Sequence, residues 1–204
     1  MLSLPNPDGI SNPLKRPGFF PRLRSYIFSK LPPQQEENPN IRKKLTVTYI
    51  ARNDPRRRIH NDKKLVDAMK NAGWKVDIMR MDSTPAGLIN TLRKLEKTDV
   101  LMGVHGAGLA YAWLLPPTSI LVELTDAFGN DLQLFRNVAA MSEVPYYRVN
   151  IVNDVSPDFV NKQGRAFIGE DSIASIIERV PALLDKAKEE RTDKEKTGEV
   201  RRDE

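Results

Sequence analysis

The chain has 204 residues, 40% of them hydrophobic, a formal net charge of +5 and no cysteine. This length suits one domain with appendages, and the absence of cysteine excludes disulfides and zinc–thiolate sites. No apolar run approaches the roughly 18 residues of a spanning helix, and no signal-peptide pattern or nucleic-acid recognition motif is visible, so we expect neither a membrane segment nor a nucleic-acid partner in this chain. The positive balance fits anionic ligands, although a basic, soluble surface also explains it.

The N-terminal segment, residues 1–40, is rich in proline, asparagine and charge. Its apolar spacing predicts one short helix from about residue 21 to 31, followed by a linker. Between residues 41 and 187 the pattern changes to alternating elements. It predicts strands at 45–50, 74–79, 100–104, 119–124 and 146–152, and helices at 61–71, 83–97, 107–115, 132–141 and 171–186. Residues 188–204 carry charges without apolar periodicity, which predicts a disordered tail.

Alternating strands and helices predict an α/β fold, a Rossmann-like parallel sheet flanked by helices and joined by right-handed crossovers. Ligands of such sheets bind at the carboxyl ends of the strands. Three polar loops follow the first, third and fourth predicted strands, at 52–58, 105–108 and 123–126. A parallel sheet would bring these loops to one rim.

A glycine-rich turn follows the third predicted strand. Three glycines, at positions 103, 106 and 108, surround His105 and permit a backbone path that residues with a Cβ resist. A helix that begins directly after the turn would direct free N–H groups and the positive end of its dipole at a bound anion. We therefore predict a phosphate-binding turn in which His105 contacts phosphate or sugar. The alternative is a histidine that only hydrogen-bonds a backbone carbonyl.

The loop after the first predicted strand contains four arginines within seven residues, at positions 52, 56, 57 and 58. Such crowding is costly unless anions offset the repulsion, and guanidinium groups bind phosphate oxygens bidentately. We predict that Arg52 and one or two of the three consecutive arginines hold a diphosphate. The alternative is a solvated basic loop.

Glu123 stands near the end of the fourth predicted strand. A carboxylate there can accept the hydroxyls of a ribose, as acidic residues do in dinucleotide-binding folds, and the alternative is a surface salt bridge. Because the chain has only two histidines, no cysteine and no Asp-x-Asp pair, we expect neither a transition-metal site nor a magnesium–diphosphate clamp. The sequence contains no Walker A, G-x-G-x-x-G or G-x-S-x-G fingerprint.

Taken together, these segments resemble glycosyltransferase family 61, over about residues 20 to 150. The matching pieces are Tyr49-Ile-Ala-Arg52, Arg57-Arg-Ile-His-Asn61, Leu65-Val-x-Ala68, Thr98-Asp-Val-Leu-Met-Gly-Val-His-Gly-Ala-Gly-Leu109, Leu115-Pro-Pro and Val122-Glu-Leu. The resemblance implies the C-terminal, donor-binding half of a two-domain GT-B enzyme. Such an enzyme would move a sugar from a UDP-sugar to a hydroxyl of a protein or glycan, with inversion, without a metal or other cofactor, and in the secretory pathway.

The resemblance also implies roles for individual residues. Arg52, Arg57 and Arg58 would hold the diphosphate, and Glu123 would hold the ribose. His105 and the amides of the following residues would support the diphosphate; these residues are Gly106, Ala107, Gly108 and Leu109. Asn61 would cap the following helix instead of contacting the ligand.

Two features depart from the family pattern. Tyr111 stands where many members carry Asn or His, and the N-terminal acceptor half, from which the catalytic base is expected, has almost no counterpart here. We therefore expect a truncated form of the enzyme with an unidentified base. The alternatives are a non-catalytic nucleotide-binding fragment of the family and another phosphate-handling Rossmann-like enzyme.

Overall fold

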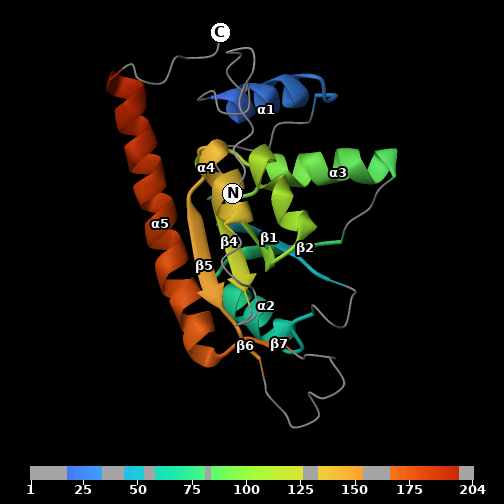
Figure 1. Cartoon of the computed structure of the whole chain (residues 1–204), viewed down its shortest axis with the longest axis vertical. Helices are drawn as coiled ribbons and strands as arrows, with labels where there is room; N and C mark the ends of the chain where they lie inside the picture. Colours follow the sequence, from blue (N-terminus) through green and yellow to red (C-terminus); the bar gives the residue numbers. More distant parts are fainter. Residues whose placement is uncertain are drawn as a thin grey trace, which may run out of the picture.

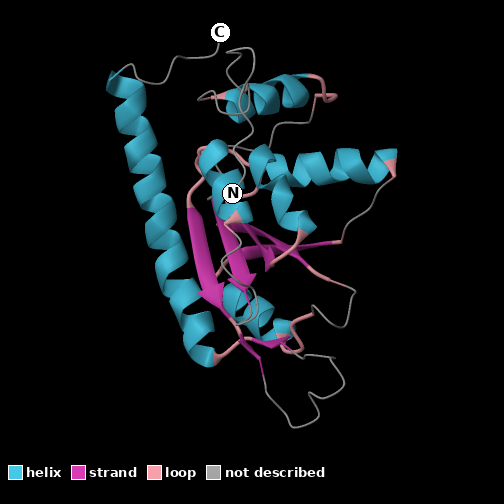
Figure 2. Ribbon diagram, viewed as in Figure 1, coloured by secondary structure: helices cyan, strands magenta, loops and turns pink. Residues whose placement is uncertain are grey.

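The structure, a computed structural model, describes residues 18–33, 44–52, 58–80, 84–125, 133–153 and 166–197. Its centre is a five-stranded parallel sheet with helices on both faces, as Figures 1 and 2 show. The strands are β1 (Thr46–Ile50), β2 (Lys75–Met79), β3 (Val100–Val104), β4 (Ile120–Thr125) and β5 (Tyr146–Asn150). This confirms the predicted α/β, Rossmann-like parallel sheet, and each strand overlaps its predicted range.

The strand order, β2-β1-β3-β4-β5, changes direction between β1 and β3. The segment after β1 leads to one edge of the sheet and the segment after β3 leads toward the other edge. Helix α2 (Asp62–Asn71), which follows β1, packs on one face, whereas the 3₁₀ helix η3 (Ala107–Leu114), which follows β3, packs on the opposite face. In doubly wound sheets of this order, ligands bind at such a switch point, outside the carboxyl ends of the strands.

The first face of the sheet is covered by α2 and by the long helix α5 (Glu170–Thr197). Alternate strand residues meet apolar residues of both helices in a core that includes Val47, Val100, Val122, Leu65, Met69, Ile176 and Val180. Both faces of β3 and β4 are covered, so these strands are almost wholly buried, and this explains why their sequences are nearly continuous apolar runs.

The second face is covered by α3 (Pro85–Glu96), η3 and α4 (Leu134–Met141). Helix α3 begins as the sequence predicts, with Pro85 in its first turn, and the Thr84 hydroxyl accepts a hydrogen bond from the Gly87 N–H at 3.1 Å. The core of this face includes Ile50, Leu101, Leu121, Leu92, Leu109 and Phe135.

Helix α1 (Phe19–Ser29) lies on the outer side of η3. The rings of Phe20 and Trp113 are 5.9 Å apart, and Arg24 Nε donates to the Leu114 carbonyl at 3.0 Å. The short helix predicted near residues 21–31 is therefore present, and it closes the second face over the C-terminal end of η3.

The helix predicted after the glycine turn is present, but it is a 3₁₀ helix. Its buried residues are Leu109, Ala112 and Leu114, and Leu115, directly after the helix, is buried as well. A 3₁₀ helix has three residues per turn, so the spacing of Leu109 and Ala112 places both side chains on the face toward the core.

Helix α5 is longer than predicted, since it continues to Thr197. The prediction of a disordered tail is wrong for residues 188–197, and residues 198–204 lie outside the described residues. Lysine, arginine and glutamate are good helix formers without an apolar stripe. Pairs such as Lys186–Glu190, at 3.7 Å, and Lys196–Asp193, at 3.8 Å, add the usual small contribution of neighbouring opposite charges on a helix.

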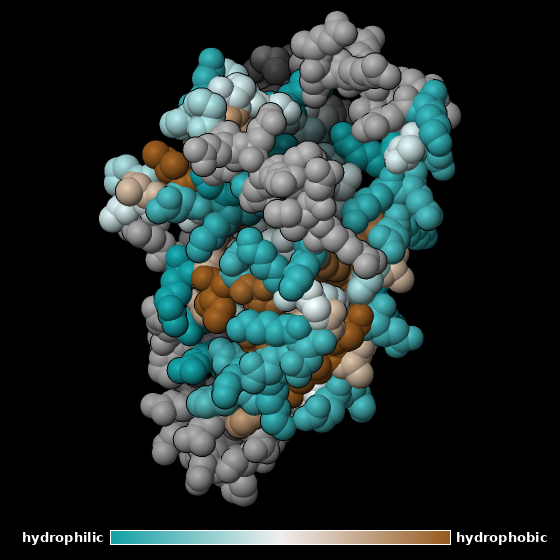
Figure 3. Space-filling model, turned by 180° about the vertical axis from the view of Figure 1, so that it is seen from behind, coloured by the Kyte–Doolittle hydropathy of each residue, from teal (hydrophilic) through white to brown (hydrophobic). Residues whose placement is uncertain are grey.

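The rear of the molecule is mostly hydrophilic, with an apolar area at mid-height (Figure 3). Exposed large apolar side chains include Ile78 of edge strand β2 and Leu88 and Ile89 of α3. Across the described ranges, no helix combines the length and the apolar composition needed to cross a membrane.

Candidate donor-binding site

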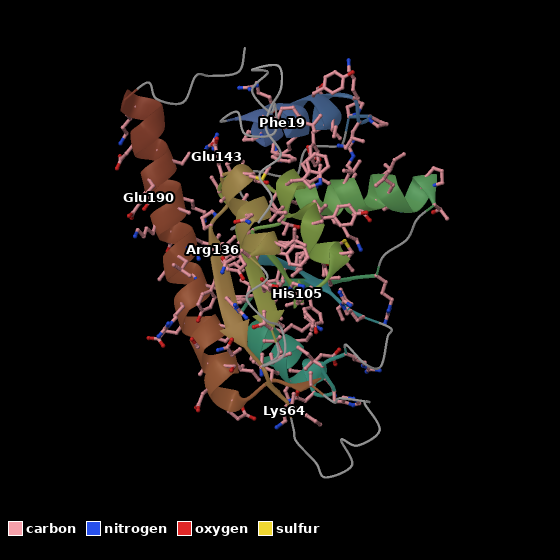
Figure 4. The ribbon with its side chains drawn as sticks, viewed as in Figure 1. Phe19, Lys64, His105, Arg136, Glu143 and Glu190 are labelled. Carbon is pink, nitrogen blue, oxygen red and sulfur yellow. The ribbon has the colours of Figure 1, made fainter. Side chains whose placement is uncertain are left out.

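The carboxyl ends of β1, β3 and β4 meet at one rim of the sheet, as the parallel pairing requires. Ile50 of β1 is aligned with Gly103 of β3, and Gly103 is aligned with Glu123 of β4. Arg52 and His105 follow directly after β1 and β3, and His105 is labelled in Figure 4. The predicted residues Arg52, His105 and Glu123 therefore lie together at the switch point of the sheet.

Arg52 packs against the glycine turn. A Cβ added to Gly106 would lie 1.3 Å from Arg52 Nη2 and 2.5 Å from its Cζ, so the guanidinium occupies the space that a side chain at position 106 would need. Gly106 also has φ +152° and ψ 172°, a backbone conformation that is essentially restricted to glycine. The predicted backbone path that residues with a Cβ resist is confirmed at Gly106, and Arg52 occupies the space of the missing side chain.

The rest of the turn is closed by its own backbone. The Leu109 N–H donates to the Gly106 carbonyl at 2.8 Å, and the Leu109 side chain is buried. The amide of Leu109, one of those predicted to support a diphosphate, is therefore already bonded within the turn. Ala107 is exposed and Gly108 is half-buried at the surface of the turn.

Gly103 is required by close packing. A Cβ at this position would lie 3.1 Å from the Ile50 Cβ and 3.4 Å from Leu109 Cδ2. The missing side chain lets β1, β3 and the start of η3 approach one another, and this brings Arg52 close to the turn.

His105 and Glu123 are hydrogen-bonded to each other. His105 Nδ1 bonds to Glu123 Oε1, and the Tyr146 hydroxyl donates to Glu123 Oε2. Glu123 is only 1% exposed, whereas the His105 side chain is 23% exposed. The ribose contact of Glu123 stays a prediction, and a ribose hydroxyl would have to reach a carboxylate that is almost completely buried.

Two neighbours of this pair were not predicted. Burial, and then the hydrogen bond to Glu123, raise the pKa of Tyr146, so its phenol stays protonated and can donate. The ring of Phe135, on α4, meets the His105 ring edge-on with centroids 4.9 Å apart. The sequence does indicate that Glu123 needs a partner, because a carboxylate within an apolar strand requires buried hydrogen-bond donors. It does not indicate that Tyr146 is the donor, because this depends on how β4 and β5 pair.

The remaining arginines of the first loop are only partly described. Arg58 is exposed, and Arg57, like Arg56, lies outside the described residues. The two residues after Arg58 are anchored to the fold: the Ile59 side chain is buried, and the His60 N–H donates to the Ala166 carbonyl at 2.9 Å.

Asn61 holds the N-cap position of α2, as expected, but its side chain makes no capping hydrogen bond. Its Nδ2 donates to the Ile168 carbonyl at 2.8 Å, and its Oδ1 accepts from the Ile168 N–H at 2.9 Å. The amide thus pairs with the backbone as a neighbouring strand would. Ile168 follows two short antiparallel strands that were not predicted, β6 (Val152–Asn153) and β7 (Ala166–Phe167). Asn61 therefore ties the end of the arginine loop to the segment before α5.

Within the described part of the chain, no group of three or more histidine, aspartate or glutamate side chains is arranged to hold a metal ion. A guanidinium also lies at the end of β4, where Arg148 Nε donates to the Thr125 hydroxyl at 3.1 Å. Figure 4 labels Arg136 on α4. The rim can therefore attract an anion through its guanidinium groups.

Comparison with known proteins gives consistent matches over most of this region. The sequence model of the family described as Glycosyltransferase 61 matches residues 10–122. An "EGF domain-specific O-linked N-acetylglucosamine transferase" from Pan troglodytes is 29% identical over 141 residues, covering 69% of this chain and 26% of that protein. Proteins with the same description are 31% identical in Bos taurus, over 56% of this chain and 21% of theirs, and 28% identical in Drosophila melanogaster, over 63% and 24%.

The chain thus spans about a quarter of the length of these relatives. A solved structure, rubredoxin oxygen:oxidoreductase from Desulfovibrio gigas, superposes with a TM-score of 0.41 and 14% identity over 69% of this chain and 37% of that one. The family match covers more than half of the chain and includes both the arginine loop and the glycine turn. The chain belongs to the glycosyltransferase 61 family.

Proposed function

We propose that this chain binds the UDP-sugar donor of a glycosyltransferase that transfers a sugar to a hydroxyl of a protein or glycan. Family membership supports the glycosyltransferase activity. The names of the matched relatives make N-acetylglucosamine and an EGF domain the first sugar and acceptor to test. The family resemblance makes the secretory pathway the first location to test.

One observation carries this proposal: the Arg52 guanidinium lies against Gly106 at the switch point of the sheet, next to His105. A fixed cation, an imidazole and a glycine turn at the carboxyl ends of β1 and β3 are the groups that a diphosphate requires at this position. Arg58, and Arg57 by the family pattern, would extend the same site along the first loop.

In the proposed reaction, the bond between the anomeric carbon and the diphosphate oxygen breaks while an acceptor hydroxyl attacks the opposite face of that carbon with inversion. Negative charge develops on UDP, and Arg52 and His105 stabilise it. Electrostatic stabilisation by fixed groups is commonly the largest catalytic contribution, worth several kcal/mol per group. Such a site would act without a metal, because the arginines replace the cation.

The acceptor hydroxyl must lose its proton to a base on the face opposite the leaving diphosphate. Under the proposed GT-B arrangement, in which this sheet is the donor-binding half, the base comes from a second domain. Under this arrangement sugar transfer requires the second domain, whereas donor binding does not.

Calorimetric titration of UDP into Arg52→Ala, Arg58→Ala and His105→Ala variants tests this assignment. Each loses a charged hydrogen bond and should bind at least about tenfold more weakly. Arg179→Ala removes an exposed arginine from α5, on the other face of the sheet, and should bind UDP as the unaltered chain does. Equal affinity in all four variants would refute the site.

Two further assays separate the alternative functions. Tight UDP binding without hydrolysis or transfer of a UDP-sugar would favour a non-catalytic fragment. In a thermal-shift screen, stabilisation by sugar phosphates in preference to UDP would favour another phosphate-handling enzyme.

A further inference from the structure

Tyr146, Glu123 and His105 form a continuous hydrogen-bonded row across three neighbouring strands. The row runs from the start of β5, through β4, to the residue that follows β3. Each oxygen of the Glu123 carboxylate faces one side chain. Because Glu123 is almost completely buried, loss of either bond would leave a desolvated oxygen without a donor, so the carboxylate is held in one orientation.

This orientation determines which nitrogen of His105 is left for a ligand. A carboxylate can only accept, so Nδ1 carries the proton that bonds to Glu123. Nε2 has no hydrogen-bond partner among the residues that the structure describes. The Phe135 ring lies edge-on to the imidazole and restricts its rotation. The exposed part of His105 lies next to the turn that Arg52 contacts.

We propose that Tyr146 is a positioning residue for donor binding: through Glu123, it holds His105 with Nδ1–H bonded to the carboxylate, so that the second proton of the imidazolium, on Nε2, is donated to a diphosphate oxygen. The identification of the ligand as a diphosphate rests on the proposed function. The orientation of the imidazole does not, because side chains of this chain fix it without a ligand.

Glu123→Gln gives a sharp test. The Tyr146 hydroxyl is a donor and would select the carbonyl oxygen of the new amide, which leaves the amide NH₂ facing His105 Nδ1. Nδ1 must then accept, so the neutral imidazole changes to the Nε2-protonated tautomer. In the double variant Glu123→Gln/Tyr146→Phe the amide is released from the phenol, its oxygen can turn to His105, and the Nδ1-protonated tautomer should return.

Nitrogen-15 NMR of the imidazoles reads these tautomers directly, at a pH raised until both rings are neutral. The chain has only two histidines, and a His60→Gln variant assigns the signals. We expect Nδ1–H in the unaltered chain, Nε2–H in Glu123→Gln, and mainly Nδ1–H in the double variant. Nε2–H in the unaltered chain, or the same tautomer in Glu123→Gln with and without Tyr146, would overturn the proposal.

The second part of the test compares UDP binding by variants of two adjacent tyrosines, Tyr146 and Tyr147. Tyr146→Phe should weaken UDP binding about three- to tenfold, the usual effect of one lost hydrogen bond. Tyr147→Phe is the matched control, because its hydroxyl bonds to Ser175 of α5, at 2.8 Å, on the opposite face; it should change neither the affinity nor the tautomer. If the tautomers behave as expected but the unaltered chain does not bind UDP, the proposed function fails and the orientation of His105 stands.

Discussion

Replacing Gly106 with alanine is expected to displace Arg52 from the glycine turn. The new methyl carbon would lie 1.3 Å from Nη2, 2.5 Å from Cζ and 3.1 Å from Nη1 of Arg52. No small adjustment relieves contacts of this kind, so the guanidinium must move away. It is the far end of a long side chain, so the chain should still fold with Arg52 in another position.

The substitution has two separable costs. The backbone at Gly106, with φ +152°, is strained for any residue with a Cβ, and such strain costs about 1–3 kcal/mol. For a chain of this size, each kcal/mol lowers the Tm by about 2–4 °C. Under the proposed function, the displaced guanidinium can no longer bond to the diphosphate, and the loss of a charged hydrogen bond should weaken UDP binding at least about tenfold.

A substitution at a second glycine, Gly73, serves as a control that separates the loss of stability from the loss of UDP affinity. Gly73 also has a positive φ, +83°, but a Cβ built there meets nothing within 4 Å, and it lies between α2 and β2, at the amino ends of the strands. Gly73→Ala should therefore lower the Tm and leave UDP affinity unchanged, whereas Gly106→Ala lowers both. The reasoning is refuted if Gly106→Ala binds UDP normally while Arg52→Ala does not, or if Gly73→Ala weakens UDP binding equally.

Other predictions concern the scaffold. Asn61→Ala removes both hydrogen bonds to Ile168 and should lower the free energy of unfolding in urea by about 1–3 kcal/mol, with Asn61→Asp intermediate; no change would contradict the pairing. Burial raises the pKa of Tyr49 and Tyr146 above the ordinary value of 10.0, so unfolded phenols lose their protons first and stability falls as pH rises above about 10. Tyr49→Phe should make this alkaline fall in Tm shallower, and an equal slope would count against its burial. Ending the chain after Arg191 removes exposed helix and should change the free energy of unfolding by less than about 0.5 kcal/mol, as urea unfolding can check.

The fold could be predicted because its main signals are local. The apolar runs of β3 and β4 need only their own sequences to be recognised as buried strands, and Pro85 marks the start of α3. The carboxyl-end rule then places residues after β1 and β3 at one rim without further information. The prediction of a disordered tail failed because the absence of an apolar stripe was taken as the absence of a helix. Charged residues with high helix propensity extend α5 to Thr197.

The contacts within the site could not be predicted to the same degree, because they are long-range. Arg52 and Gly106 are 54 positions apart, and nothing in either segment specifies that the guanidinium fills the space beside the turn. The partnership of Glu123 with Tyr146 depends on the register of β4 against β5, which a single sequence does not fix. The side chain of Asn61 was misjudged for the same reason: Asn61 holds the N-cap position, but its amide bonds to the distant Ile168 backbone with the atoms that a local cap would use.

The geometry of Glu123 and His105 bears on what this chain can do alone. Both oxygens of the buried Glu123 carboxylate accept hydrogen bonds, one from His105 and one from Tyr146. If His105 contacts the diphosphate, it cannot also deprotonate a hydroxyl on the opposite face of the anomeric carbon. Neither residue is then placed to act as the base of an inverting transfer. We expect the isolated chain to bind UDP and UDP-N-acetylglucosamine with similar affinity and to transfer no sugar to an EGF domain. Transfer by the purified chain, lost in Glu123→Gln, would show that the base lies in this site after all.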